Sequence, residues 1–276
     1  MLKNIRSIAR SVPVFHKLAR RMKTSLSEAI GEFYTLSPDV LVALVKAFNI
    51  QNARLLKGHN LLEGHGYYEF GLFRGFSFWF AEQISREYAG SSFRLFGFDS
   101  FQGLPPPQLD VEAAVFRKGD FCGSYETVTT NLKKWKTDLS RISLHQGFYS
   151  NTLFKRLRQS EQFLPVSICL IDVDLYESCV PVLDFIKDFL VEGSILLFDD
   201  YNQFAENDQD NSSVERRALI EFERKNPGFR KECGENGQGE RKALIEFERK
   251  NPGFRKEHLF DYGSEGAAFR VLSVGD

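Results

Sequence analysis

The chain has 276 residues, 42% of them hydrophobic, and a formal net charge of −1. This length suits one large α/β domain with an extension. A charge so close to zero gives no reason to expect a nucleic acid as partner, and no apolar run approaches the length of a membrane span. The four cysteines have no CxxC spacing, so we expect reduced thiols in a cytoplasmic protein rather than disulfides or a zinc site.

Residues 1–58 are predicted to be a basic, helical N-terminal extension. Every charged residue before Glu28 is Lys or Arg, and the apolar residues between them can form a stripe along a helix. Such a segment suits an anionic membrane surface, a partner subunit, an organellar transit peptide, or a helix packed on its own domain, and these alternatives stay open. Ser37 and Pro38 suit the N-cap and first residue of a further helix.

Residues 66–77 are typical of a strand, a glycine turn and the start of a helix. Gly71 and Gly75 let the backbone approach a ligand, and the helix N-terminus offers free N–H groups. Taken alone this turn is a weak signal, because it lacks the full dinucleotide fingerprint. The next predicted strand ends at Asp99, where nucleotide-binding α/β folds hold ribose hydroxyls. The alternative for Asp99 is a turn into the proline-rich loop that follows.

Two later apolar runs each end in a pair of carboxylates. The pairs are Asp172 with Asp174 and Asp199 with Asp200. Runs of this kind predict buried parallel strands whose carboxyl ends open onto a site. Converging carboxylates repel one another unless a cation or a proton lies among them, and aspartate oxygens suit Mg²⁺. The alternative is that these residues merely cap helices or solvate loops.

The segment between the two pairs has the spacing of a helix packed on one face. Its apolar positions run from Val182 to Leu190, with Pro181 expected near the helix start and Gly193 just past its end. Strand, helix and strand of this length predict one right-handed βαβ unit, which brings the two acidic pairs together. His145, at the end of a further predicted strand, is expected to be structural or to lie near a bound adenosine.

The tail contains a duplication. Residues 218–232 recur unchanged as 243–257, within a duplicated segment 215–257, and each copy predicts a short helix stopped by Asn-Pro-Gly. Two copies do not make a solenoid. We expect one copy to precede two closing strands near residues 258–260 and 268–272, and the other to be an exposed insertion. The extra copy reflects either a tandem duplication or a sequence-assembly artefact. Deleting residues 234–258 should then leave the fold intact.

Four motifs, in order between about residues 60 and 205, resemble the macrocin O-methyltransferase family. They are Tyr68-Glu69-Phe70-Gly71-x-x-x-Gly75-x-Ser77, Gly97-Phe98-Asp99-Ser100-Phe101-x-Gly103-Leu104-Pro105, Asp172-x-Asp174-x-Tyr176 and Asp199-Asp200-Tyr201. The resemblance implies a class I methyltransferase domain over residues 59–276. Its Rossmann-like sheet should be mostly parallel, with helices on both faces and an antiparallel closing strand. It also implies a magnesium-dependent enzyme that uses S-adenosylmethionine (SAM) to methylate sugar hydroxyls of natural products.

The same resemblance implies roles for individual residues. The cofactor would contact Glu69, Gly71, Gly75 and Ser77 at its methionine end, Asp99 and Ser100 at its ribose, Asp120 and Phe121 near its adenine, and Asp172. The metal ligands would be Asp172, Asp199 and Asp200, with Asp174 as general base. Other readings are a catechol-type O-methyltransferase, a cofactor-binding scaffold without activity and, least well supported, a nicotinamide-dependent dehydrogenase. We also expect a homo-oligomer.

Overall fold

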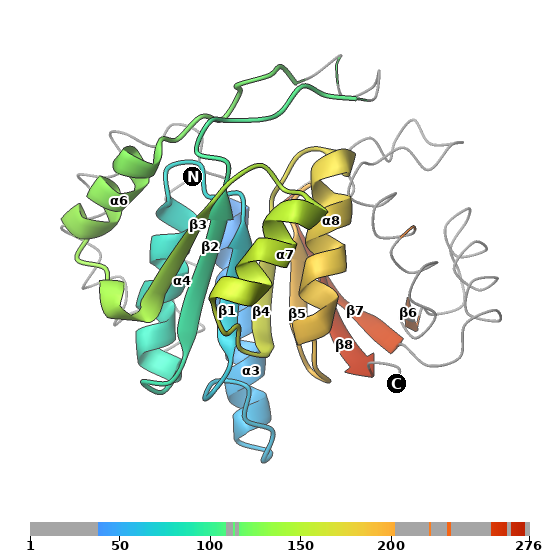
Figure 1. Cartoon of the computed structure of the whole chain (residues 1–276). Coiled ribbons are helices and arrows are strands. Elements are labelled where there is room, and N and C mark those ends of the chain that lie inside the picture. Colours follow the sequence, from blue (N-terminus) through green and yellow to red (C-terminus); the bar gives the residue numbers. More distant parts are fainter. Residues whose placement is uncertain are drawn as a thin grey trace.

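The computed structural model describes residues 38–108, 113, 116–201, 221, 231–232, 255–263 and 266–273. Its strands form one eight-stranded sheet in the order β3-β2-β1-β4-β5-β8-β7-β6 (Figure 1). The strands are β1 (Gly66–Phe70), β2 (Arg94–Asp99), β3 (Ile142–Gln146), β4 (Val166–Ile171), β5 (Ile195–Phe198), β6 (Lys231–Glu232), β7 (Arg255–Tyr262) and β8 (Gly266–Ser273). Strand β8 runs against both of its neighbours, and the other described pairings are parallel. The predicted fold class is confirmed.

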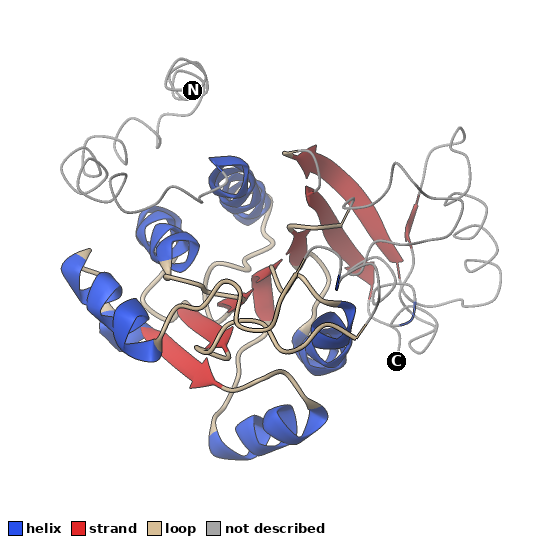
Figure 2. Ribbon diagram, turned by 90° about the horizontal axis from the view of Figure 1, so that it is seen from above, coloured by secondary structure: helices blue, strands red, loops and turns tan. Residues whose placement is uncertain are grey.

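Helices cover both faces of the sheet, as the view along its edge shows (Figure 2). The α-helices are α3 (Pro38–Leu55), α4 (Phe76–Tyr88), α6 (Tyr125–Lys134), α7 (Asn151–Ser160) and α8 (Tyr176–Ile186), with 3-10 turns η1 (Leu139–Arg141) and η2 (Lys187–Phe189). Helices α3, α4 and α6 share one buried apolar cluster, while α7 and α8 share the other. Strands β1, β4 and β5 are buried on both faces, so they read as near-continuous apolar runs.

Alternate residues of each strand feed the two clusters. Tyr67 packs under α4, whereas Tyr68 and Phe70 pack toward α7 and α8. Phenylalanines dominate the second cluster: the rings of Phe70 and Phe98 lie 4.5 Å apart on neighbouring strands. Most of the described aromatic residues therefore pack in the core.

Helix α8 differs from the sequence prediction. It begins at Tyr176, directly after the turn that carries Asp174, so Pro181 lies inside the helix rather than near its start. The first helical turn is closed by the amides of Ser178 and Cys179, which both donate to the Leu175 carbonyl. Proline lacks an N–H, so its position in the helix leaves one backbone carbonyl of the preceding turn without its usual donor.

The duplicated segment is described at the end of each copy and at Glu221. Strand β6 of the first copy pairs in parallel with β7, Lys231 opposite Lys256 and Glu232 opposite Glu257. The end of the second copy supplies the first residues of β7, where Lys256 is 1% exposed and lies over the Phe269 ring at 4.4 Å. The end of the second copy thus joins the first of the two closing strands. The predicted helix of each copy lies mostly outside the described residues.

One further prediction concerns a segment outside the described part of the chain, the basic residues 1–37 of the extension. Among the helices that are described, none has the length and apolarity to cross a membrane.

Candidate active site

A cavity of about 330 Å³ opens at the carboxyl ends of β1, β2, β4 and β5. The strand order reverses between β1 and β4, and ligands of open α/β sheets bind at such a switch point. Backbone hydrogen bonds fix the loops there: the Gly71 amide donates to Phe98 and the Asp172 amide to Phe70. Gly71 has φ of 92°, and a Cβ at this position would lie 1.7 Å from the Asp172 carbonyl oxygen. Only glycine can occupy this position.

The glycine turn leads into α4, whose first residues line the cavity. Gly75 caps this helix in a left-handed conformation (φ 82°) and makes no side-chain cap, so the amides of the first turn point out of the helix. Phe76 and Ser77 border the cavity at this helix end. The positive end of the helix dipole favours a negatively charged ligand group at this place.

Glu69 lies behind Ser77 and is fully buried. Ser77 Oγ donates to one carboxylate oxygen at 2.6 Å, and the Tyr67 hydroxyl donates to the other. Burial raises the pKa of Glu69 to about 8, despite these two hydrogen bonds, which favour the charged form. Glu69 therefore contacts the cavity wall only through its hydrogen bond with Ser77, which lines the cavity.

Asp99, at the tip of β2, holds the glycine turn in place. Its carboxylate accepts hydrogen bonds from the amides of Leu72 at 2.7 Å and Phe73 at 3.1 Å, and from Phe101 at 2.6 Å. Burial raises its pKa, and the amide donors oppose this shift. Asp99 and Ser100 both line the cavity.

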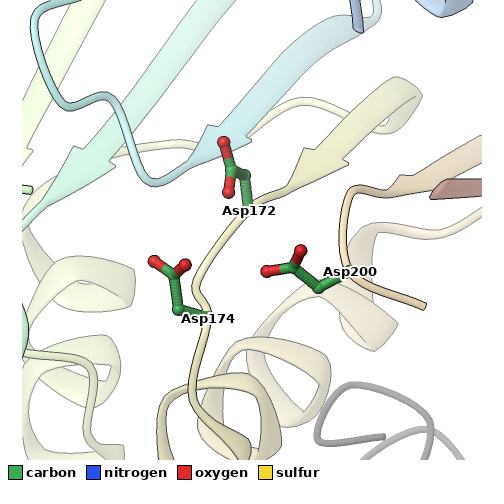
Figure 3. A group of neighbouring side chains, drawn as sticks. All are labelled: Asp172, Asp174 and Asp200. Carbon is green, nitrogen blue, oxygen red and sulfur yellow. The ribbon is translucent and has the colours of Figure 1, made fainter. Parts of the chain in front are cut away.

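Three carboxylates converge on the cavity from the ends of β4 and β5. One oxygen from each of Asp172, Asp174 and Asp200 lies within 4.8 Å of the others, and the side chains point toward one another (Figure 3). Asp199 also lines the cavity. Burial, followed by the charges of Asp199, Asp120 and Asp99, raises the pKa of Asp174 to about 7. Such a set of oxygens fits a hard divalent cation, which would relieve their mutual repulsion.

Some of the remaining predicted residues line the cavity, and the others lie behind it. Phe121 lines the cavity, but Glu69, Gly75 and Asp120 are absent from the described residues that border it. The Asp120 carboxylate accepts from the Arg117 amide at 2.7 Å and so closes the turn before Phe121. His145 is structural: it stacks on Phe98 at 4.7 Å, and Nε2 lies 3.1 Å from Glu161.

Sequence reasoning missed several residues that shape the cavity. Gly123 is the clearest case, because a Cβ there would lie 1.6 Å from the Phe73 carbonyl oxygen. Phe116, Phe148 and Tyr149 line the cavity, and the Tyr149 hydroxyl donates to Phe98 at 2.9 Å. A glycine followed by Ser124, the N-cap of α6, is the signal that marks a tight approach before a helix.

The glycine turn after β1, the acid at the tip of β2 and the closing strand β8 define a class I methyltransferase. The sequence profile of the macrocin-O-methyltransferase (TylF) family matches residues 59–218. The chain therefore belongs to this family of SAM-dependent O-methyltransferases. A comparison with curated proteins found no match.

Solved methyltransferases share the fold. The O-methyltransferase NovP has a TM-score of 0.58 at 17% identity, with 83% of this chain and 79% of NovP covered. The calicheamicin methyltransferase CalS11 has a TM-score of 0.56 at 18% identity, with 94% and 93% covered. TomG from Streptomyces achromogenes, an O-methyltransferase solved with SAM, has a TM-score of 0.50 at 10% identity, with 93% and 89% covered. At these identities the likeness concerns the fold alone.

Proposed function

We propose that this enzyme transfers a methyl group from SAM to a hydroxyl of a sugar or glycosylated natural product, with Mg²⁺ as a required ion. The observation that carries the proposal is the convergence of Asp172, Asp174 and Asp200 on the cavity beside the glycine turn. The family name, which refers to macrocin, and the calicheamicin methyltransferase CalS11 support this acceptor class.

The cofactor would lie along the carboxyl edge of the sheet. Its carboxylate suits the N-terminus of α4 beside Ser77, and its ribose suits Asp99 and Ser100 at β2. Asp99 already accepts three backbone amides, so a ribose hydroxyl would share this carboxylate with the glycine turn. Glu69 would act through Ser77 as a positioning residue.

Asp172 and Asp200, with Asp199 beside them, would hold the metal. When bound there, Mg²⁺ supplies a Lewis acid that lowers the pKa of a coordinated acceptor hydroxyl and orients its oxygen. The structure places Asp174 within the same oxygen cluster, whereas the family resemblance puts Asp199 there as a ligand. Asp174 could therefore either bind the cation or accept the proton of the acceptor hydroxyl, and we assign it the second role.

Asp174 is suited to the role of general base. Burial and the neighbouring carboxylates raise its pKa to about 7 when no cation lies among them. Bound Mg²⁺ would lower this pKa, so the carboxylate would be charged and able to accept a proton near neutral pH. Its backbone has φ of 56°, a left-handed conformation that is uncommon outside glycine and that occurs at functional sites. The carboxylate would accept the hydroxyl proton while the oxygen attacks the methyl carbon of SAM in line, and the bond from that carbon to sulfur breaks, so that SAH is the leaving group.

Calorimetric titration of S-adenosylhomocysteine (SAH) and Mg²⁺ into wild type and Asp199→Asn tests the proposal. We expect the wild type to bind both, and Asp199→Asn to lose affinity for the metal while it keeps SAH. A panel of glycosides and catechols then identifies the acceptor class, and turnover of catechols alone would favour the catechol-type reading. A wild type that bound no SAH would contradict the proposal, whereas one that bound SAH and methylated no acceptor would favour a cofactor-binding scaffold without activity. A cytoplasmic location, homo-oligomer formation and membrane contact through residues 1–37 stay predictions.

A further inference from the structure

Two phenylalanines line the cavity while much of each ring stays exposed. Phe121 is 47% exposed and Phe148 is 40% exposed, although most phenylalanines of the described chain are buried. Exposed aromatic surface inside a cavity is surface that a ligand can remove from water, at roughly 25 cal/mol per Å². The two rings therefore indicate ligand contacts at two positions.

The two residues follow different parts of the sheet. Phe148 follows β3, and three strand spacings separate β3 from β4, about 14 Å in all. Asp172 and Asp174 follow β4. Phe148 thus belongs to a loop on the side of the sheet where Asp99 ends β2 and the ribose is proposed to lie.

Phe121 belongs to the loop between β2 and α6, which reaches toward the carboxylates. Leu104 and Phe116 of this loop form a buried cluster with Leu175, the residue after Asp174. The Leu104 amide donates to the Asp120 carbonyl at 2.9 Å, and the ring of Phe121 lies 6.3 Å from that of Phe116. Phe121 therefore stands on a wall anchored beside the carboxylate cluster.

The backbone at Phe121 is strained. Phe121 has φ of 53°, and Phe73, which meets it edge-on at 6.2 Å, has φ of 48°. The left-handed region is unfavourable for a bulky residue, and such backbone strain is found at functional sites. The close passage of Gly123 over the Phe73 carbonyl locks the two loops together. Both rings are therefore held at the cavity mouth by the surrounding structure.

We propose that Phe121 is a specificity-determining residue that stacks on an aromatic or otherwise apolar aglycone of the acceptor, and not a contact of the cofactor adenine as the family resemblance implies. This inference rests on the proposed function and adds to it the group next to the methylated sugar. Aromatic rings stack on planar apolar groups in offset or edge-on geometry, in addition to burying their area. Phe148, in contrast, belongs to the cofactor end.

The test compares Phe121→Ala with the matched variant Phe148→Ala. The probes are 4-nitrophenyl and methyl glycosides of the same sugars, in the presence of Mg²⁺, and SAH for the cofactor end. We expect wild type to prefer the 4-nitrophenyl glycoside, and Phe121→Ala to reduce the ratio of the two kcat/KM values by about 10-fold, while its Kd for SAH changes less than about 2-fold. Phe148→Ala should weaken the binding of SAH and leave the ratio of the two kcat/KM values unchanged.

Three results would overturn the inference. One is a loss of SAH affinity in Phe121→Ala as large as in Phe148→Ala, which would assign Phe121 to the cofactor. Another is an equal loss for both glycosides, and the third is a wild type that binds them equally by calorimetry in the presence of SAH. Phe121→Trp should keep the preference, which separates loss of the ring from damage to the loop. A wild type that binds SAH and prefers the 4-nitrophenyl glycoside but methylates no glycoside contradicts the proposed function, not the stacking.

Discussion

At the scale of single residues, Asp174 carries the chemical step of the proposed mechanism. Asp174→Asn keeps the shape of the side chain but cannot accept a proton, so turnover should fall by about 10²- to 10⁴-fold. SAH affinity should stay close to that of wild type, because the proposed ribose and methionine contacts belong to β2 and to the glycine turn after β1. Single-turnover methyl transfer and SAH calorimetry measure the two effects. Turnover near the wild-type rate would exclude Asp174 as the base.

Glu69 makes stability depend on pH. Its pKa of about 8 in the folded protein exceeds the ordinary value of 4.5, so the folded state binds this proton more tightly than the unfolded state. The resulting stabilisation is complete below about pH 4.5 and is lost as the pH rises to about 8. Glu69→Gln cannot titrate and should lose less stability between pH 5.5 and 8.5. Urea unfolding of both proteins without ligand at the two pH values measures this difference, and parallel changes would contradict it.

At the scale of elements, the cavity depends on loops that meet without room for side chains. The added methyl of Gly123→Ala would overlap backbone of the glycine turn, at 1.6 Å from the Phe73 oxygen. We expect a loss of roughly 1–3 kcal/mol in stability and a clear loss of SAH affinity. Gly90→Ala is the matched control, because its methyl would meet only Glu63 at 3.7 Å or more. Equal behaviour of the two variants would show that the loops can separate freely.

These loop contacts also mark the limit of what the sequence predicts at this scale. Gly71, Asp99, Asp172 and Asp200 were identifiable because each follows an apolar run that predicts a buried strand. The cluster of Leu104, Phe116 and Leu175 has no local signal, since it joins a loop after β2 to a turn after β4. Pro181 misled the prediction of α8 for a related reason. Local preference places proline at a helix start, but the turn at Asp174 fixes where this helix begins.

At the scale of the whole molecule, the order of elements follows from simple rules. Parallel strands joined by helices require right-handed crossovers, which gives a sheet with helices on both faces and a site at its switch point. The predicted pair of closing strands extends further than the sequence suggested, from Arg255 to Ser273. The pairing of β6 with β7 was not predictable, because identical segments give no preference for which copy joins the sheet.

The duplication can be tested by removing one copy without changing the sequence of the closing strands. Deletion of Cys233–Glu257 joins the first copy to His258, so that an identical Arg-Lys-Glu precedes His258. Strand β6 is two residues long at the sheet edge, and its loss removes few hydrogen bonds. We expect Tm within about 2 °C of wild type and unchanged SAH affinity, since changes of less than about 0.5 kcal/mol are typical away from the core.

The register of this deletion matters. Removing residues 234–258 instead would put Cys233 in the place of His258, whose Nε2 lies 2.8 Å from Asp261 and whose ring contacts Phe269. The two deletions have the same length, so a lower Tm for the second alone would show that His258 belongs to the closing strands. A large fall in Tm for both would mean that the fold requires both copies, and that the first is more than an insertion.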